Sequence, residues 1–404
     1  MTSASGRMLV FGDYAVGYGN GIGETLSNLL EPLPDERLFQ VHPRHTSAPL
    51  DQARGTSVPF DLPRRPGWVP DSAGLLYAPL LKAQQAAAER RVARQAASII
   101  REHGITTVLT FPVTPWILFA AVRLRRAFPK LRFVFYVMDD WEGHHTCFGL
   151  PFTPRRRRAL ADMVAGADAR FACSHRMRHD YEERFDVPWQ VLHKGVRLGD
   201  VAPRCHAPRA PWRILYAGGL NIFRADAVLA FVEGLRLFRE RTGHLATLTL
   251  LGAGPNAQAA PEVAMHDFVS VEPWVDNDEC RRRQSQADLL YLPLSMLPKV
   301  DRIANLAMPT KFSEYLASGR PVIFHVPFPS EVQDLAAGAG LPLTINSVDP
   351  EVICATLTQL DREGLDAARY HQASVALLTR EFDERQLQAR LLEACFGGAE
   401  PCES

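Results

Sequence analysis

Short apolar strands alternate with longer helical segments along almost the whole chain, and this alternation limits the possible folds more than any other feature. The pattern runs from residue 8 to residue 192, stops at a segment rich in proline, and returns from residue 212 to residue 396. Strands separated by helices of this length predict parallel sheets covered by helices on both faces. A chain of 404 residues is long enough for two such domains in tandem.

The first domain, residues 1–197, is expected to be Rossmann-like. Residues 44–80 are rich in proline, glycine and serine and are expected to be irregular. Strands are predicted at Met8–Phe11, Thr106–Phe111, Leu131–Met138, Ala169–Cys173 and Trp189–Leu192, and helices at Thr25–Leu33, Ala83–Glu102, Trp116–Phe128, Arg155–Ala165 and Arg176–Phe185.

Residues 198–211 hold three prolines and no apolar period, which predicts a linker. A second Rossmann-like domain is expected over 212–380, followed by a C-terminal helical segment, 381–404, that is a candidate to return to the first domain. Strands are predicted at Trp212–Ala217, Ala246–Leu251, Phe268–Val271, Leu289–Leu292 and Pro321–Phe324, and helices at Ala225–Thr242, Asp278–Ala287, Pro350–Glu363, Leu365–Glu381 and Arg385–Phe396.

Composition narrows the class of protein. With 47% hydrophobic and 22% charged residues, the chain is typical of a globular protein. The seven cysteines are scattered and form no CxxC pair, which favours reduced thiols in a cytoplasmic protein over disulfides or zinc ligation. No basic segment followed by an apolar one opens the sequence, so we expect no signal peptide. The apolar run 114–122 is too short to span a bilayer.

The net charge is zero, but it is unevenly distributed. Residues 1–197 carry 26 Lys and Arg against 19 Asp and Glu, and the remainder carries the reverse. A basic half is typical of proteins that approach an anionic membrane, so a peripheral contact of this kind is one interpretation; no nucleic acid is expected as partner. The alternative is that arginine-rich helices simply have solvated faces.

The segment Met308–Ile323 predicts a short helix, a glycine stop and a buried strand. Pro309 and Thr310 suit the beginning of a helix. Lys311 and Glu314 are three residues apart and share one face of the first turn. A lysine beside a helix N-terminus favours a diphosphate, and a carboxylate one turn further on can accept hydrogen bonds from a ribose. The alternative is an ordinary surface ion pair.

Ligands of parallel sheets bind beyond the carboxyl ends of strands, so the segments that follow strands deserve inspection. Asp139, Asp140, His144 and His145 follow the third predicted strand and suit hydroxyl binding or base catalysis better than a metal. A glycine-rich segment follows the first strand, where Gly19, Gly21 and Gly23 allow a ligand close approach but miss the spacing of a dinucleotide fingerprint. The alternatives are local helix capping and a flexible turn.

The second half offers further candidates for a phosphorylated ligand. Gly218 and Gly219 end one predicted strand, Gly252 ends the next, and Arg224 precedes a helix. Arg224 and Lys311 together suit a diphosphate. Trp274 suits either stacking on a base or filling a core. The sequence contains neither a P-loop nor the Gly-x-Ser-x-Gly elbow of hydrolases.

Several segments, in order along nearly the whole chain, resemble the GT-B glycosyltransferases, most closely glycosyltransferase family 4. The glycine-rich segment at 17–23 is similar to that family's acceptor-side loop. The other segments are similar to its domain-closing and donor-binding motifs: ACSHRMRHDYEERF with VLHKGV, LYAGGLNIFRAD, LTLLGAGP, VSVEPWV with ADLLYLPL, and MPTKFSEYLASGRPVI.

This resemblance implies two Rossmann-like domains facing each other across a cleft, with a nucleotide-sugar donor, a UDP- or GDP-sugar, on the second. Glu314 would hold the ribose, and Arg224 and Lys311 the diphosphate. Gly218, Gly219, Gly252, Trp274, Pro309 and Thr310 would complete the donor site. Asp139, Asp140 and His144, with Arg224 and Lys311, are candidate catalytic residues, and Gly19, Gly21, Gly23 and His145 candidate acceptor residues. The family is retaining, and no metal or other cofactor is expected.

The implied activity is transfer of a hexose-type sugar to a glycan or lipid-linked acceptor in bacterial polysaccharide or glycoconjugate synthesis. Two positions depart from the family. Leu306 stands where a glutamate that contacts the donor sugar is common, and Gly219 stands where an arginine is usual. These departures keep open a scaffold protein without catalysis. A nucleotide-sugar epimerase of the same architecture is a second alternative.

Overall fold

The computed structural model describes residues 6–49, 52–61, 74–149, 151–252 and 260–397. The chain divides into two compact units. The N-terminal unit contains residues 1–141, 151–192 and 385–404, and the C-terminal unit contains residues 142–150 and 193–384. Both are parallel α/β structures, as the sequence predicts. Among the described residues, no helix combines the length and the apolarity that crossing a membrane requires.

Within the described residues, the N-terminal unit holds a seven-stranded parallel sheet in the order β3-β2-β1-β4-β5-β6-β7. Its central strands are buried on both faces, as parallel strands covered by helices are. The strands are β1 (Arg7–Gly12), β2 (Leu38–Pro43), β3 (Thr56–Phe60), β4 (Ile105–Phe111), β5 (Arg132–Val137), β6 (Ala169–Ala172) and β7 (Gln190–Val191).

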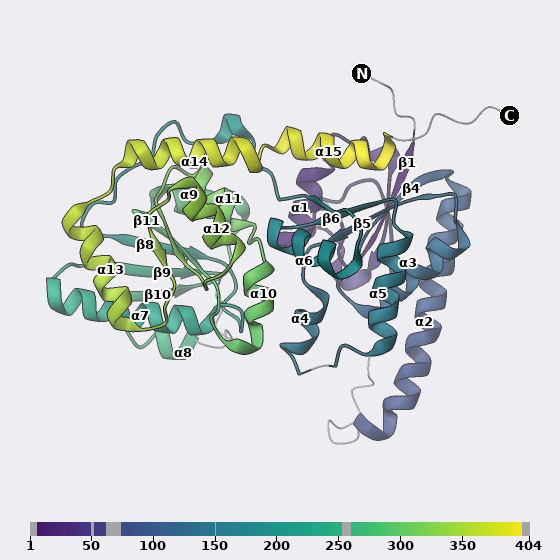
Figure 1. Ribbon diagram of the computed structural model, residues 1–404, viewed down its shortest axis with the longest axis horizontal. Coiled ribbons are helices and arrows are strands. Elements are labelled where there is room, and N and C mark those ends of the chain that lie inside the picture. The colour runs from purple at the N-terminus through teal and green to yellow at the C-terminus, as the bar shows by residue number, and fades with distance from the viewer. Residues whose placement is uncertain (1–5, 50–51, 62–73, 150, 253–259, 398–404) are drawn as a thin grey trace. The chain divides into compact units, whose positions relative to one another are not determined.

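Helices cover this sheet, and Figure 1 shows α2, α3 and α5 grouped beside one another. The last helix, α15, also belongs to this unit, because Gln388 bonds to the Asn28 carbonyl and Thr107 to the Cys395 carbonyl. The helices are α1 (Gly21–Leu29), α2 (Gly74–Glu102), α3 (Pro115–Ala127), α5 (Pro154–Gly166), α6 (His175–Phe185) and α15 (Glu384–Phe396), with 3-10 turns at Asp35–Arg37 and Arg44–Thr46.

The C-terminal unit holds, among its described residues, a six-stranded parallel sheet in the order β10-β9-β8-β11-β12-β13. One core cluster lies between the sheet and helices α7 and α13, and a second between the sheet and helices α11, α12 and α14 (Figure 1). The strands are β8 (Arg213–Ala217), β9 (Thr247–Leu251), β10 (Val269–Glu272), β11 (Leu289–Pro293), β12 (Val322–His325) and β13 (Thr344–Ile345).

Some helices of this unit have side-chain or glycine caps: Asp276 and Ser330 cap helix N-termini, and Gly243 ends α7 with a positive φ of 75°. They are α4 (Trp141–Thr146), α7 (Ala225–Thr242), α8 (Ala260–Val263), α9 (Asn277–Gln286), α10 (Asp301–Leu306), α11 (Lys311–Ala317), α12 (Glu331–Ala339), α13 (Pro350–Glu363) and α14 (Ala367–Glu381), with 3-10 turns at Leu198–Asp200 and Pro298–Val300.

The prediction that residues 44–80 are irregular is wrong in part. Strand β3 lies in this range, and α2 begins at Gly74, nine residues before the predicted start. Strand β3 is short, mostly solvent-facing and contains Pro59, so it has no hydrophobic alternation; a proline is tolerated there because β3 is an edge strand. Residues 62–73 lie outside the described residues, as do Ala253 and Gly254 of the predicted donor-side motif.

The predicted linker, 198–211, packs against the C-terminal unit. The Ala202 amide donates to the Ala317 carbonyl at 2.8 Å, and the His206 amide donates to the Gly319 carbonyl at 3.1 Å. Cys205 is part of a core cluster. Gly319 has a φ of 70°, and a Cβ there would lie 2.6 Å from the Arg204 carbonyl oxygen. The segment is therefore packed against α11. The boundary between the units lies earlier in the chain, between residues 192 and 193.

Candidate functional site

Helix α11 of the C-terminal unit carries Lys311 and Glu314. Thr310 is its N-cap residue but makes no side-chain capping bond, and Pro309 accepts a bond from the Phe312 amide at 2.9 Å. Tyr315 is buried and its hydroxyl accepts a bond from the Ala217 amide at 2.8 Å, which ties the helix to the end of β8. The face bearing Lys311 and Glu314 is thereby fixed near the carboxyl end of the sheet.

Glu314 lies between two lysines. Its Oε1 is 2.5 Å from Lys194 Nζ, and its Oε2 is 2.7 Å from Lys311 Nζ. Burial raises the pKa of Glu314, but the charges of Lys194 and Lys311 outweigh burial and bring that pKa to about 2. We name these three residues the lysine–glutamate triad. It carries one net positive charge at neutral pH, so it is more than the simple surface pair that the sequence left open.

The segment after β8 brings a third cation towards the triad. Arg224 is the N-cap residue of α7, and its side chain bonds only weakly, at 3.4 Å, to Asn221. Burial raises the pKa of Tyr216, and the charges of Arg224 and Lys311 oppose this rise, which places both cations near that hydroxyl. The Tyr216 hydroxyl donates to the Gly219 carbonyl at 2.9 Å and shapes the Gly218–Gly219 turn.

Trp274 borders the same strand ends. A Cβ on Gly252 would lie 3.8 Å from Trp274 Cδ1 and 3.9 Å from Gly218 backbone atoms, so two predicted glycines and the indole are neighbours. Gly252 has a φ of 83° and its amide donates to the Glu272 carbonyl. The Trp274 side chain is 69% exposed, so it does not fill a core. Its flat face is accessible to a ligand.

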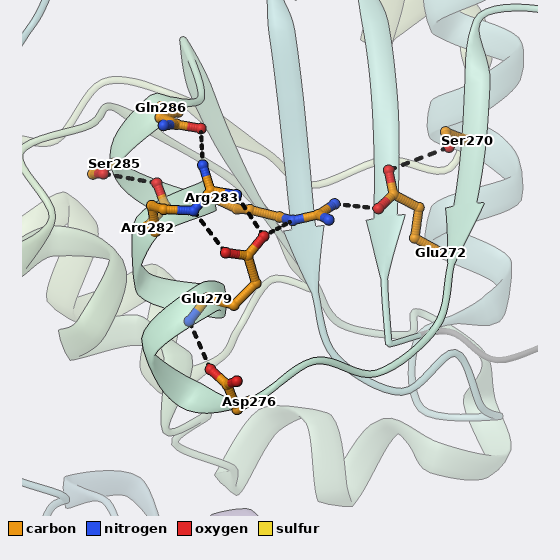
Figure 2. A network of polar contacts seen from close by, with 8 residues as sticks. All are labelled: Ser270, Glu272, Asp276, Glu279, Arg282, Arg283, Ser285 and Gln286. Carbon is orange, nitrogen blue, oxygen red and sulfur yellow. Dashed lines mark hydrogen bonds and ion pairs between the residues drawn. The ribbon is translucent and has the colours of Figure 1, made fainter.

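A network of ion pairs holds both ends of the turn that carries Trp274 (Figure 2). Arg283 of α9 bonds to Glu272 at the end of β10 and also to Glu279 at 2.7 Å. Asp276 caps α9 by accepting the Glu279 amide at 2.8 Å. The turn is therefore fixed on the strand side and on the helix side.

The predicted acidic and histidine residues after β5 separate into two sets. Asp140 is buried in the N-terminal unit and lies 3.6 Å from Arg184 of α6, a contact that suits a structural role. Asp139 is half-buried and acts on the pKa of Tyr14 in the same unit. Glu142–Leu150, by contrast, belongs to the C-terminal unit together with His144 and His145.

Ring contacts connect the segment that contains His144 to the turn that precedes Arg224. The His144 ring lies 5.5 Å from the Phe148 ring, which lies 6.0 Å from the ring of Phe223, the residue before Arg224. His144 is half-buried, whereas His145 is only 4% exposed. Within the C-terminal unit, His144 is thus the more accessible of the two predicted histidines.

The glycine-rich segment of the N-terminal unit forms the beginning of a helix. Helix α1 begins at Gly21, four residues earlier than predicted, and Asn20 caps it by accepting the Gly23 amide at 2.8 Å. A Cβ on Gly23 would lie 2.2 Å from the Tyr18 carbonyl oxygen, so this glycine is required by local packing. Gly19 is exposed with open space around it and remains accessible to a ligand.

Two polar residues were missed by the site prediction. The prediction from sequence gives Lys194 no role; its signals are its place in the VLHKGV segment and the small number of lysines, five among 45 basic residues. Asp13, directly after β1, is buried and accepts bonds from the Val113 amide and from the Thr114 amide and hydroxyl. Burial raises the Asp13 pKa, although these bonds oppose the rise. Asp13 joins two strand ends and has a structural role.

The two departures from the family pattern have clear structural settings. Leu306 is buried at the end of α10, where a carboxylate would have to be desolvated. Gly219 is exposed, and a Cβ there would meet no atom within 4 Å. The site therefore has room for the arginine that Gly219 replaces.

Comparisons with known proteins agree with this architecture. No family model matches the sequence, and no curated protein matches it. Among solved structures, HepE of Anabaena in complex with UDP is similar at a TM-score of 0.64 and 12% identity, covering 96% of this chain and 98% of that chain. The trehalose-6-phosphate synthase OtsA is similar at a TM-score of 0.69 with the same identity and coverages.

A UDP-forming trehalose-phosphate synthase from Burkholderia xenovorans is similar at a TM-score of 0.65 and 13% identity, covering 98% of this chain and all of that one. At these identities the likeness concerns the fold. These neighbours are GT-B glycosyltransferase structures, and the chain has the same two-unit GT-B fold.

Proposed function

We propose that this protein is a glycosyltransferase that binds a nucleotide sugar on its C-terminal unit. The observation that carries the proposal is the lysine–glutamate triad beside Arg224 at the carboxyl ends of β8 and β9. Glu314 accepts bonds from a ribose, Lys311 and Arg224 bind the diphosphate, and Trp274 lies beside the base over Gly252 and Gly218. The UDP bound to the similar HepE structure supports a uridine nucleotide, and a GDP-sugar is the other candidate.

Binding is tested by thermal-shift titration with UDP, GDP, ADP, CMP and dTDP. A ligand at 100 times its dissociation constant stabilises the folded protein by about 2.7 kcal/mol, which is readily detected. We expect one nucleoside diphosphate to stabilise the wild type and not Glu314→Ala. Glu351→Ala, which removes a surface ion pair with Arg241 in the same unit, is the matched control and should respond as the wild type does. The absence of a shift with every nucleotide would refute the donor site.

The reaction is proposed to be retaining transfer of a hexose-type sugar, in line with the family 4 resemblance. The acceptor oxygen bonds to the anomeric carbon as the bond to the diphosphate breaks, and the acceptor proton passes to a leaving diphosphate oxygen. Arg224 and Lys311 stabilise the charge that develops on that diphosphate. Asp139 and Gly19 of the N-terminal unit are candidate acceptor residues, and His144 of the C-terminal unit is a separate candidate for positioning the acceptor hydroxyl.

Product analysis tests this chemistry. The product linkage, determined by NMR, should keep the anomeric configuration of the donor, and inversion would contradict the retaining mechanism. Because cations of the protein supply the positive field, activity should persist in EDTA; its loss there, restored by a divalent ion, would show that a metal is needed.

The acceptor is proposed to be a glycan or lipid-linked sugar of bacterial polysaccharide synthesis, met at an anionic membrane. Arg90, Arg94 and Arg101 of α2 and Arg123 of α3 line one hollow in the N-terminal unit. The charges of Arg90 and Arg123 oppose the rise that burial causes in the pKa of Glu89, so one carboxylate lies near this group. Clustered arginines near a bilayer are each attracted by about 1 kcal/mol to anionic lipid.

Liposome co-sedimentation tests this contact. The wild type should prefer phosphatidylglycerol-containing vesicles over neutral ones, and the double variant Arg94→Glu and Arg123→Glu should lose that preference. Arg362→Glu, an exposed arginine of the C-terminal unit, is the control. Equal sedimentation with neutral and anionic vesicles would remove the membrane contact from the proposal.

Two alternatives have specific tests. An epimerase would convert its nucleotide sugar without an acceptor, so product analysis with donor alone separates it from a transferase. A scaffold, favoured by Leu306 and Gly219, would turn over no donor even by hydrolysis. Gly219→Arg should then bind nucleotide more tightly without gaining turnover.

A further inference from the structure

Lys194 makes the shortest contact of the lysine–glutamate triad, yet the family resemblance gives it no role. Its ammonium is 2.5 Å from Glu314 Oε1, whereas Lys311 takes the other oxygen, Oε2, at 2.7 Å. The side chains of Lys194, Lys311 and Glu314 are 13%, 28% and 22% exposed. Glu314 is thus held from two sides in a site that remains open to a ligand.

The division of the two oxygens between two lysines has a consequence for hydrogen bonding. An ionised carboxylate offers about four lone-pair positions, two on each oxygen. Each lysine occupies a position on a different oxygen, which leaves accepting capacity on both. Two adjacent oxygens with capacity left on each match two adjacent hydroxyl groups. If Lys194 were absent, the carboxylate would be free to turn about its last torsion towards Lys311.

The backbone of Lys194 is fixed by contacts on two sides. Its carbonyl accepts a bond from the Ser313 hydroxyl of α11 at 3.3 Å, directly beside Glu314. The Val196 amide donates to the Phe382 carbonyl at 2.8 Å. A Cβ on Gly195 would lie 2.6 Å from Glu384 Cα, so the chain passes in close contact there. The backbone that carries the Lys194 ammonium is therefore fixed, and the ammonium contacts Glu314 from a defined position.

We propose that Lys194 is a positioning residue of the donor site, which orients the Glu314 carboxylate towards both hydroxyls of a ribose and makes the site selective for ribonucleoside over 2′-deoxyribonucleoside diphosphates. This inference rests on the proposed function, because it requires Glu314 to bind the ribose. Lys194 also supplies one of the positive charges that the triad and Arg224 present to the diphosphate, so its removal weakens both classes of nucleotide.

The experiment measures dissociation constants of UDP and dUDP by calorimetry on the full chain. Loss of one hydrogen bond to a charged acceptor should make the wild type prefer UDP by about tenfold or more. Lys194→Met should reduce this preference to less than threefold, and Lys194→Arg, which keeps a cationic donor, should restore most of it. Lys299→Met, an exposed lysine of the same unit, should keep the wild-type preference.

The outcomes distinguish a failure of the Lys194 role from a failure of the Glu314 role. If Lys194→Met weakens UDP and dUDP equally and keeps their ratio, Lys194 contributes charge or stability and the positioning role is refuted. The ratio is insensitive to a uniform loss of folded protein, so partial unfolding of the variant does not imitate the expected result. If the wild type binds UDP, or GDP in its place, with no preference over the 2′-deoxy form, or binds none of these nucleotides, the assignment of Glu314 to the ribose fails first.

Discussion

Glu314→Gln is the substitution for which the structure allows the effect on stability to be worked out. An ordinary glutamate has a pKa of 4.5, and the two lysines bring that of Glu314 to about 2. At about 1.4 kcal/mol per pKa unit, the folded state gains about 3 kcal/mol from keeping this carboxylate ionised. Because the folded-state pKa is depressed, this contribution is complete above pH 4.5 and is lost as the pH falls towards 2.

The expected result is a gap between wild type and variant that depends on pH. For a unit of this size, about 3 kcal/mol corresponds to a decrease in Tm of about 6 °C or more at pH 7. About 2 kcal/mol of the wild-type advantage is lost by pH 3, so the gap should shrink to about a third. Thermal unfolding followed by circular dichroism at pH 7, 5, 4 and 3 measures it, and comparing the two proteins cancels the acid sensitivity that they share.

Glu279 provides the control. Its arginine partners also bring its pKa to about 2, first through the hydrogen bond from Arg282 and then through that from Arg283. The network lies at the surface of α9, where Arg282 is 54% exposed, so solvent and salt screen it. Glu279→Gln should change the Tm little, and about 0.5 M NaCl should remove the difference. A gap for Glu314→Gln that is constant from pH 7 to pH 3, or no larger than that for Glu279→Gln, would refute the reasoning.

Three further predictions concern other parts of the C-terminal unit. Gly195→Ala should lower stability by about 1–3 kcal/mol, because its Cβ would lie 2.6 Å from backbone, whereas Gly199→Ala, with open space around it, should not; thermal melts compare them. Trp274→Ala should leave the Tm unchanged, since the side chain is 69% exposed, but should weaken UDP binding about tenfold if the indole stacks on the base, as calorimetry will show. Tyr291→Phe should cost about 1–3 kcal/mol, because it leaves the buried His325 ring nitrogen, now 2.7 Å from the hydroxyl, without its donor; urea unfolding checks this value.

The alternation of strands and helices was sufficient to predict the two parallel sheets. The prediction failed where strands do not depend on hydrophobic pattern. Strand β3 is an edge strand with a proline, and its place is determined by pairing with β2 rather than by its own residues. Strand β2 is fully buried yet contains Gln40 and His42, whose side chains bond to neighbouring segments.

The candidate site shows a similar limit. Lys311 and Glu314 are close in sequence, so helical periodicity predicts that they share a face. Lys194 lies 120 residues before Glu314, and no local pattern indicates that the two will meet. Asp140 and His144 are a second example of a site that sequence alone does not predict. They are close in sequence, but the chain passes from one unit to the other between them. Contacts between residues that are far apart in sequence depend on the topology of the fold.

The place where the C-terminal unit begins and ends has a further consequence. Val196 and Asp383 pair in a parallel bridge, and the His193 ring stacks on Phe382 at 4.6 Å. Apart from residues 142–150, this unit is one continuous insertion whose two ends meet. Because the two ends of this insertion lie next to each other, it can be exchanged between related chains without changing the fold of the N-terminal unit. In evolution, and in protein engineering, such a junction allows the C-terminal unit to be replaced as a module.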